Sequence, residues 1–285
     1  MITPETLGRP GRLDDVDPSL LAVGWSGEPA IVVSALRAGL WHTLASHGDL
    51  DAVRPWASVT KLATALAAAI DVEDGRARLD DAVGPEGSTL AHLMSHSSGL
   101  GFEASDPVVA PATKRIYSNY GIDLAATHLS AGTDLATWLD RRVVAPLSMT
   151  STHLVGRASE GLFGSTRDLA AFAREWIAPT LVSAHRRDVT ATAYLPELAG
   201  IVPGFGRFTP CPWGLGVEIR GEKQHWMGDW PARSFGHFGR SGALALVSVD
   251  EGLCVVATST VEFGPWAHDL WPTWTSNVRQ FAGAS

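Results

Sequence analysis

Cysteine, basic residues and long apolar runs are all scarce in this sequence. The 285-residue chain has only two cysteines, Cys211 and Cys254, too few for a disulfide scaffold; one bridge is possible, but two separate buried thiols are the favoured interpretation. Its 22 basic residues form no run longer than a pair, and the formal net charge is −8. An acidic surface repels phosphate backbones, so we expect no nucleic-acid partner. The longest apolar stretch, residues 62–70, is too short to cross a bilayer, so we expect no membrane partner either.

The length and composition favour one globular domain. Apolar residues make up 45% of the chain and charged residues 18%, which argues against a disordered protein. Residues 1–17 have no basic segment followed by an apolar run. The sequence therefore predicts no secretory signal peptide, and we expect a cytoplasmic location.

The order of the predicted elements indicates an α+β fold. Strand patterns at both ends of the chain flank a mainly helical middle. We therefore expect an α/β sandwich, in which helices flank an antiparallel sheet built from both chain ends and an all-helical subdomain is inserted. Within one domain spanning 1–285, the α/β subdomain would comprise residues 18–61 and 178–285, and the helical subdomain residues 62–177.

Individual elements follow from periodicity and from capping residues. The expected strands are residues 20–25, 30–36, 40–45, 213–219, 234–238, 243–249 and 253–259. The expected helices include residues 58–70, 121–130 and 134–144, the last capped by Thr133. Another is capped by Thr89 and ends at Ser95, and a further one follows Ser165 and ends near Ile177. One or two more are expected within 266–281. The Pro/Gly-rich residues 196–212 are expected to form a long loop.

Three short motifs follow one another along the chain. With only three lysines present, Ser-x-x-Lys is expected about 0.24 times by chance, and it occurs once, at Ser58 and Lys61. With two asparagines and three tyrosines, Tyr-x-Asn is expected about 0.02 times, and it occurs once, at Tyr117 and Asn119. His-x-Gly, at residues 237–239, is expected about once by chance. The order of the three motifs therefore carries more weight than any one of them.

The spacing of Ser58 and Lys61 suits nucleophilic catalysis. A serine at a helix start lies where backbone N–H groups and the helix dipole favour negative charge. Lys61 would lie one turn further on the same face, and a desolvated lysine can accept the serine proton. Tyr117 could pass that proton to a leaving group, while Asn119 could hold the lysine amine or a substrate carbonyl. A strand carrying residues 237–239 would close the pocket and supply a backbone donor.

With these motifs the sequence resembles the serine β-lactamase and penicillin-binding protein superfamily, in its class C β-lactamase-like branch. The resemblance runs in the family's order from Trp56 to Thr258. It is carried by residues 56–61, 73–81, 92–100 (HLMSHSSGL), 145–150 (APLSMT) and 164–169 (GSTRDL) as well as by the three motifs. The branch includes esterases, D-Ala-D-Ala carboxypeptidases and acyltransferases, so the resemblance implies an enzyme that forms an acyl-serine intermediate.

The resemblance implies a role for each matched residue. Ser58 would be the nucleophile, and Lys61 and Tyr117 the general base and acid. The oxyanion hole would consist of the backbone N–H groups of Ser58 and Arg240. His237 would take the place of a cationic residue of the family triad. The substrate-binding residues would be Asn119, His237, Phe238, Gly239 and Arg240.

Two positions depart from the family pattern. The middle Thr or Ser of the strand triad is Phe238, so a hydroxyl that helps to bind a carboxylate is absent, and the usually small residue that follows the triad is Arg240. These departures favour a cytoplasmic esterase or amidase that acts on a small molecule. The alternatives are an acyltransferase, a β-lactamase or D-Ala-D-Ala carboxypeptidase and, in another class, a non-catalytic binding module with the same fold.

No metal and no other cofactor is expected. His92 and His96 are four residues apart on a predicted helix, but no Glu stands beside His92 and no third ligand is evident, so a capping and loop-bracing role is favoured. Most of the six tryptophans after residue 212 are expected in the core. Trp226 or Trp230 is a candidate for the lining of an acyl pocket.

Overall fold

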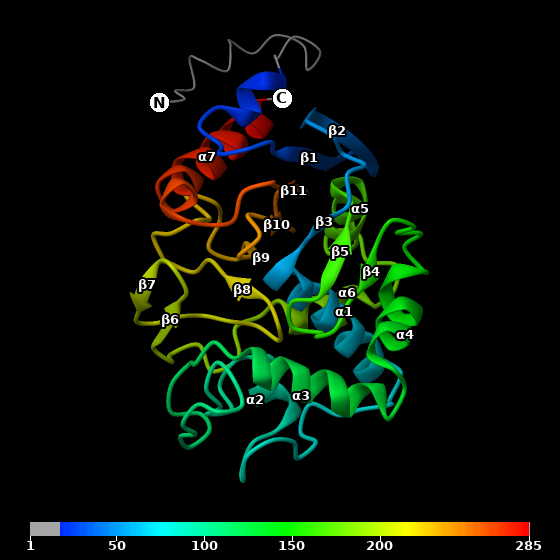
Figure 1. The fold of residues 1–285 in the computed structure, drawn as a ribbon, viewed down its shortest axis with the longest axis vertical. Helices are drawn as coiled ribbons and strands as arrows, with labels where there is room; N and C mark the ends of the chain where they lie inside the picture. Colours follow the sequence, from blue (N-terminus) through cyan, green and yellow to red (C-terminus); the bar gives the residue numbers. More distant parts are fainter. Residues whose placement is uncertain (1–17, 285) are drawn as a thin grey trace.

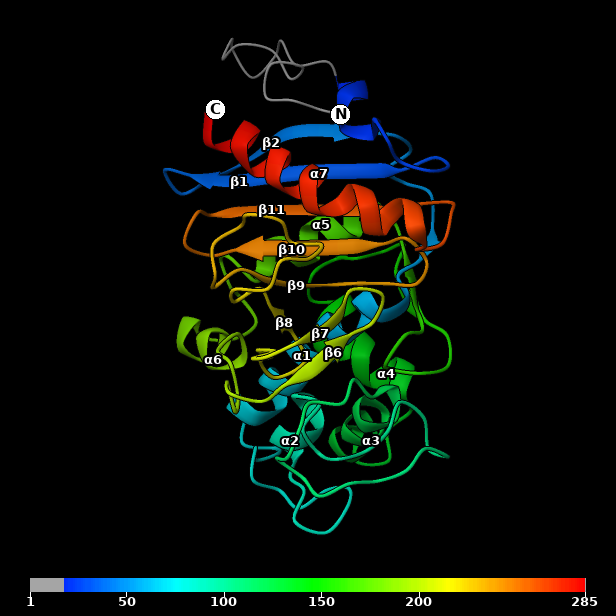
Figure 2. The ribbon, with the colours of Figure 1, turned by 90° about the vertical axis from the view of Figure 1, so that its left-hand side faces the viewer.

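A six-stranded antiparallel sheet joins the two ends of the chain (Figures 1 and 2). The structure is a computed structural model that describes residues 18–284, so residues 1–17, on which the signal-peptide prediction rests, lie outside the described part. The strands follow the order β2-β1-β11-β10-β9-β8, and β1 pairs with β11. Their bounds are β1 (Ala30–Arg37), β2 (Leu40–His47), β8 (Glu218–Ile219), β9 (Phe235–Phe238), β10 (Leu244–Ser248) and β11 (Leu253–Thr258). The predicted sheet from both chain ends is confirmed.

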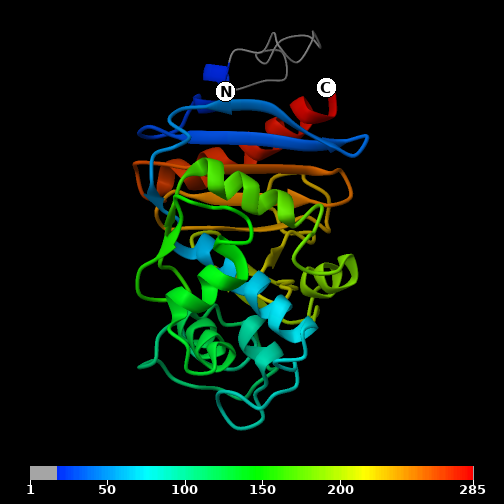
Figure 3. The ribbon, with the colours of Figure 1, turned by 90° about the vertical axis from the view of Figure 1, so that its right-hand side faces the viewer.

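Helices cover both faces of this sheet. Helix α7 (Pro265–Ala284) lies across one face in Figure 2, and α5 (Thr166–Glu175) lies across the other in Figure 3. Alternate residues of β1 enter separate cores, with Ile31 and Val33 on the α7 side and Val32 on the α5 side. This alternation is the two-residue period of a strand, and burial on both faces explains why β1 is almost continuously apolar. The arrangement is the predicted α/β sandwich.

A mainly helical region lies beside the edge of the sheet at which β8 and β9 lie (Figure 1). Its elements are α1 (Thr60–Glu73), α2 (Leu90–Met94), α3 (Asn119–Ser130), α4 (Leu135–Leu139) and the π-helix η4 (Asp140–Val144). Helix α1 is buried from Thr60 to Asp71, which explains its Ala/Leu composition. The predicted subdomain boundaries remain a prediction. Helix α5 lies within residues 62–177, the predicted helical subdomain, but packs on β11 and β1 of the sheet.

Short segments account for the rest of the architecture. Three of them form a small sheet of order β3-β5-β4 beside α1, and two form the hairpin β6-β7. The bounds are η2 (Pro18–Ala22), β3 (Arg54–Pro55), η3 (Ala57–Val59), β4 (His153–Leu154), β5 (Leu162–Gly164), α6 (Ala184–Thr190), β6 (Gly200–Val202) and β7 (Gly206–Phe208). No helix within residues 18–284 has the length and apolar character needed to span a bilayer.

Four local predictions are wrong. Residues 20–25 form the end of the 3-10 helix η2 and a turn, in which Gly24 has a φ of +86°. Only Glu218–Ile219 of the predicted strand 213–219 is extended in the sheet, because Gly216 turns the chain with a φ of +88°. The expected loop 196–212 contains the hairpin β6-β7. The cap of α4 is Asp134, which accepts from the Thr137 N–H, rather than Thr133.

One buried carboxylate ties α1 to the helices that follow it. Asp71 is 1% exposed and accepts hydrogen bonds from Arg76 Nε at 2.8 Å, Arg142 Nε at 2.7 Å and Trp138 Nε1 at 2.8 Å. Because Trp138 belongs to α4 and Arg142 to η4, this carboxylate fixes the C-terminal end of the helix that carries Lys61.

Asp71→Ala should lower the free energy of unfolding by about 3 kcal/mol or more, because it leaves the partly buried Arg142 and the buried indole N–H of Trp138 without their acceptor. Asp74→Ala is the matched control, since Asp74 pairs with the same Arg76 at the surface and should contribute under about 1 kcal/mol. Urea unfolding of both variants measures the difference. Equal effects would contradict the assigned role of Asp71.

Candidate active site

Ser58 lies in a tight turn that leads directly into α1. It is the middle residue of η3, two residues before the first residue of α1, rather than at the helix start itself. The preceding Ala57 has a φ of +46°, a left-handed conformation that costs a non-glycine residue energy. Gly239, just after β9, packs against this turn, and a Cβ there would lie 2.3 Å from Trp56 O and 3.2 Å from Ser58 N. Only glycine therefore lets the strand approach the Ser58 backbone this closely.

The amine of Lys61 is completely buried beside Ser58. Its Nζ donates to Asn119 Oδ1 at 2.7 Å and to the Ser159 carbonyl at 2.9 Å, and it lies 3.1 Å from Ser58 Oγ. Burial lowers the pKa of Lys61 to about 7, although Glu160 and Asp123 partly oppose the shift. A neutral amine therefore exists near neutral pH.

The neighbours of Lys61 decide where its lone pair points. A carbonyl oxygen and an amide oxygen can only accept, so Ser159 and Asn119 take the two N–H bonds of the neutral amine. The third position faces Ser58, whose O–H can then donate to Nζ. This geometry allows Lys61 to take the proton of Ser58.

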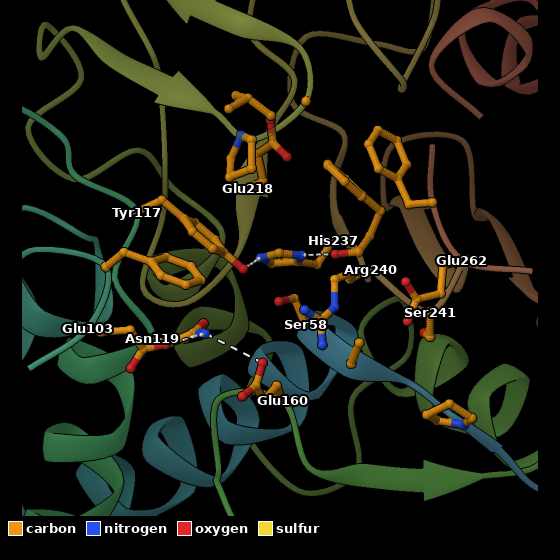
Figure 4. A pocket seen from close by; sticks show the side chains of 18 of the residues that line it. Ser58, Glu103, Tyr117, Asn119, Glu160, Glu218, His237, Arg240, Ser241 and Glu262 are labelled. Carbon is orange, nitrogen blue, oxygen red and sulfur yellow. Dashed lines mark hydrogen bonds between the residues drawn. The ribbon is translucent and has the colours of Figure 1, made fainter. Parts of the chain in front are cut away.

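Tyr117 and His237 form the opposite wall of the site. His237 Nδ1 lies 2.7 Å from the Phe238 carbonyl, which can only accept, so Nδ1 carries the proton and Nε2 is free to accept. The Tyr117 hydroxyl, 3.4 Å away, donates to that Nε2 (Figure 4). Burial lowers the pKa of His237 to about 3, and nearby Lys61 adds to the shift, so the ring is neutral rather than cationic.

Tyr117 keeps its proton. Burial raises its pKa well above the ordinary value, although a hydrogen bond with Ser58 partly offsets the rise. Lys61 Nζ lies 4.8 Å from the centre of the tyrosine ring. The structure thus brings Ser58, Lys61, Tyr117, Asn119 and His237 into one cluster, from η3, α1, the N-terminal end of α3 and β9.

An ionic network behind Asn119 has no signal in the sequence. The Asn119 Nδ2 group donates to Glu103 at 3.4 Å and to Glu160 at 3.5 Å. Arg157 pairs with both glutamates and, at 2.6 Å, with Asp123. Two separate loops and helix α3 supply these residues, so their pairing appears only in the folded chain.

A cavity of about 500 Å³ opens onto Ser58 (Figure 4). Six aromatic side chains contribute to its lining: Phe102, Tyr117, Phe163, Trp213, Phe238 and Phe263. Arg240 is exposed and contributes the one arginine or lysine side chain among the described lining residues.

Phe238 lines this cavity but is mainly a core residue. It is 7% exposed and packs against Phe263 at 5.0 Å and Trp271 at 5.6 Å between ring centroids. The prediction that Trp226 or Trp230 lines the cavity is wrong, because neither is among its lining residues; both indoles pack in the core with residues of α7. Trp213 lines it instead.

Glu218 forms a second charged group at the cavity wall that the sequence reasoning missed. It is fully buried with Lys223 and His225, both 2.8 Å from its Oε1. Burial alone would raise the pKa of Glu218, but the charge of Lys223 more than compensates and holds it well below its usual range. Glu218 therefore remains an anion paired inside the protein.

His92 and His96 brace the polypeptide. His92 Nδ1 accepts from the Thr89 N–H at the start of α2, and His96 Nδ1 accepts from the Ser118 N–H just before Asn119. Within residues 18–284, no group of three or more His, Cys, Asp or Glu side chains could hold a metal ion.

Comparisons with known proteins agree with this architecture. The family model Beta-lactamase matches residues 26–276. A beta-lactamase from Mycobacterium bovis has a crystal structure that superposes with a TM-score of 0.88 at 37% sequence identity, over 93% of this chain and 100% of that chain. None of the curated proteins matches the chain.

Two more distant structures share the fold. A beta-lactamase/D-alanine carboxypeptidase from Yersinia pestis has a TM-score of 0.71 at 20% identity, over 93% of this chain and 95% of that one. A mutant of simvastatin synthase from Aspergillus terreus has a TM-score of 0.72 at 17% identity, over 94% of this chain and 100% of that one. At these identities the likeness concerns the fold alone.

The lowered pKa of Lys61 predicts a pH-dependent stability that Lys61→Met should remove. Between the folded pKa of about 7 and the unfolded value of 10.5, the unfolded chain binds more protons. The unfolding free energy of the wild type should therefore rise with pH relative to that of the variant, and this dependence should be absent below about pH 7. The rise should reach several kcal/mol, since one pKa unit corresponds to about 1.4 kcal/mol. Urea titrations at stepped pH measure it, and a constant difference would refute the shift.

Proposed function

Because this chain belongs to the beta-lactamase family, we propose that it is a serine hydrolase that cleaves a small-molecule ester or amide through an acyl-Ser58 intermediate. The observation that carries the proposal is the buried amine of Lys61, 3.1 Å from Ser58 Oγ and with a pKa lowered to about 7. A carboxylic ester is the favoured substrate. An amidase or an acyltransferase would use the same intermediate.

Acylation begins at the Ser58–Lys61 pair. Neutral Lys61 takes the Ser58 proton while Oγ attacks the substrate carbonyl, and the carbonyl oxygen becomes an oxyanion. The backbone N–H groups of Ser58 and Arg240 stabilise that oxyanion, since Gly239 brings the end of β9 against the Ser58 turn. The leaving group then departs with a proton from Tyr117, which regains one from the lysine ammonium.

Deacylation reverses the proton movements. Water, or another acyl acceptor, gives a proton to the same base as it attacks the acyl-serine carbonyl. Ser58 leaves with a proton and the free acid or the transferred acyl product is released. His237 acts as a positioning residue, because its Nε2 holds the Tyr117 hydroxyl near Ser58 in the resting enzyme.

The cavity favours an ester with an apolar group next to the scissile bond. Six aromatic side chains line it, and residue 238 is a phenylalanine, which has no hydroxyl. His237 is neutral, so this strand provides no charge for a substrate carboxylate. These features support an esterase over an enzyme that acts on β-lactams.

One observation favours the alternative of a β-lactamase or a D-Ala-D-Ala carboxypeptidase. Arg240 lines the cavity with an exposed guanidinium that could bind a substrate carboxylate. The other alternative, a binding module without turnover, is disfavoured because Ser58, Lys61 and Asn119 are within hydrogen-bond distance of one another through the lysine amine. The cytoplasmic location and the absence of nucleic-acid and membrane partners stay predictions.

A fluorophosphonate should label the wild type on Ser58, and its rate of labelling should rise with pH through about 7 as Lys61 loses its proton. Ser58→Ala should take no label and should lose ester hydrolysis while keeping its unfolding transition. Intact-mass spectrometry measures the label. Ser241→Ala is the matched control, because Ser241 lines the same cavity. If Ser58→Ala still takes the label, Ser58 is not the nucleophile.

Turnover of p-nitrophenyl butyrate should exceed turnover of the β-lactam nitrocefin by at least about tenfold in kcat/KM. Each charge-assisted hydrogen bond that the β-lactam carboxylate lacks on this strand costs about 1.5–3 kcal/mol. Spectrophotometric assays of both substrates give the ratio. If nitrocefin is the better substrate, the β-lactamase alternative replaces the esterase, and Arg240→Met should then abolish that activity.

A further inference from the structure

A second cavity adjoins the catalytic one. Its volume is about 430 Å³, and Phe102, Tyr117 and Pro203 line both cavities. Its other walls come from residues 114–116, which lead into Tyr117, and from the hairpin β6-β7, which pairs with this segment through a bridge between Arg115 and Gly200. The two cavities are therefore neighbours that share part of their walls.

The second cavity is cationic. Lys114, Arg115 and Arg207 line it, and no carboxylate does so among the described residues. Lys114 and Arg207 are exposed, and neither forms an ion pair within residues 18–284. In a protein with a net charge of −8, this concentration of unpaired positive charge is unusual.

Arg115 adds a buried charge that forms no salt bridge with a carboxylate among the described residues, although Glu197 lies near enough to favour the charged form. The residue is 4% exposed, and burial lowers its pKa to about 10, which still leaves it charged at neutral pH. Its Nε and Nη2 groups donate at 2.7–2.9 Å to neutral backbone carbonyls. The carbonyls that its guanidinium contacts are those of Ser95, Tyr194, Leu195 and Cys211. Dipoles stabilise this cation but leave its net charge in place, so the cavity that it lines favours an anion.

The catalytic cavity has more acidic than basic side chains. Glu103, Glu160, Glu218 and Glu262 line it, beside the single arginine Arg240. Arg157 pairs with the first two, and the exposed Glu262 forms no ion pair among the described residues. An anionic substrate group is therefore more stable in the second cavity than beside Ser58.

We propose that the second cavity is an anion subsite, which binds a carboxylate or phosphate that the substrate carries at a distance from its scissile bond. The inference rests on the proposed function, because Ser58 defines where the bond is cleaved. The proposed substrate places an apolar group in the catalytic cavity and an anionic group between Lys114 and Arg207.

Three p-nitrophenyl esters with the same six-carbon acyl chain test the proposal: hexanoate, the adipate monoester, which ends in a carboxylate, and 6-phosphooxyhexanoate, which ends in a phosphate. A second pair, hexyl butyrate and the butyrate ester of 6-hydroxyhexanoate, places the anion on the alcohol side. In Lys114→Met/Arg207→Met, KM for an anionic ester should rise about tenfold or more, with kcat and the neutral esters unchanged. Comparison of the two acyl-side anions shows whether carboxylate or phosphate is preferred.

The matched control is Arg141→Met/Arg233→Met, which removes two exposed arginines that line neither cavity and should leave every KM unchanged. If the Lys114/Arg207 variant treats anionic and neutral esters of both series as the wild type does, or if Arg240→Met alone abolishes the preference for anions, the subsite does not exist.

Failure of the proposed function would look different, because the wild type would then hydrolyse neither hexanoate nor hexyl butyrate. Calorimetric binding of the adipate monoester to Ser58→Ala, with and without the Lys114/Arg207 substitutions, tests the subsite in that case. Binding that is lost only with those substitutions supports the subsite, and binding that is absent or unaffected by them overturns it.

Discussion

Lys61 lies inside the molecule with its amine bonded to a hydroxyl, an amide oxygen and a backbone carbonyl, and none of these partners is a carboxylate. Burial removes this amine from water and leaves it with neutral partners only, which lowers its pKa. The chemistry of the site depends on this shift. The three partners come from Ser58, Asn119 and Ser159, so the turn before α1, the start of α3 and the loop before β5 must meet at one point. The contacts of Lys61 thus hold these three segments together.

Charged side chains beyond these direct partners keep the pKa of Lys61 near neutral pH. Glu160 and Asp123 oppose the effect of burial on the Lys61 pKa, and Arg157 pairs with both so that they act as a balanced group. On the other wall, His237 is neutral and directs its Nε2 to Tyr117, which stays protonated. A base that can be neutral and an acid that holds its proton thus face the same serine hydroxyl. Their protonation states follow from burial and from partners supplied by distant parts of the chain.

Much of the fold follows from local patterns. The strands at both chain ends are apolar because helices cover both faces of the sheet, and the caps at Thr89 and Ser165 mark true helix starts. The errors cluster where glycine turns the chain, as at Gly24 and Gly216, because apolar composition resembles a strand there while the backbone has a positive φ. Trp226 or Trp230 is a candidate for the pocket lining from its place in the sequence, yet composition cannot tell a core indole from one that lines a cavity.

The sequence by itself determined which residue types meet at the site, since one turn separates Ser58 from Lys61, and Tyr117 and Asn119 flank the cap of α3. It also determined the sandwich, through the order of strands and helices. Only the tertiary structure decided the protonation of Lys61 and His237, the Arg157 network and the cationic cavity around Arg115. Each of these depends on how far a group is removed from water and on partners dozens of residues away, and no local pattern records either quantity.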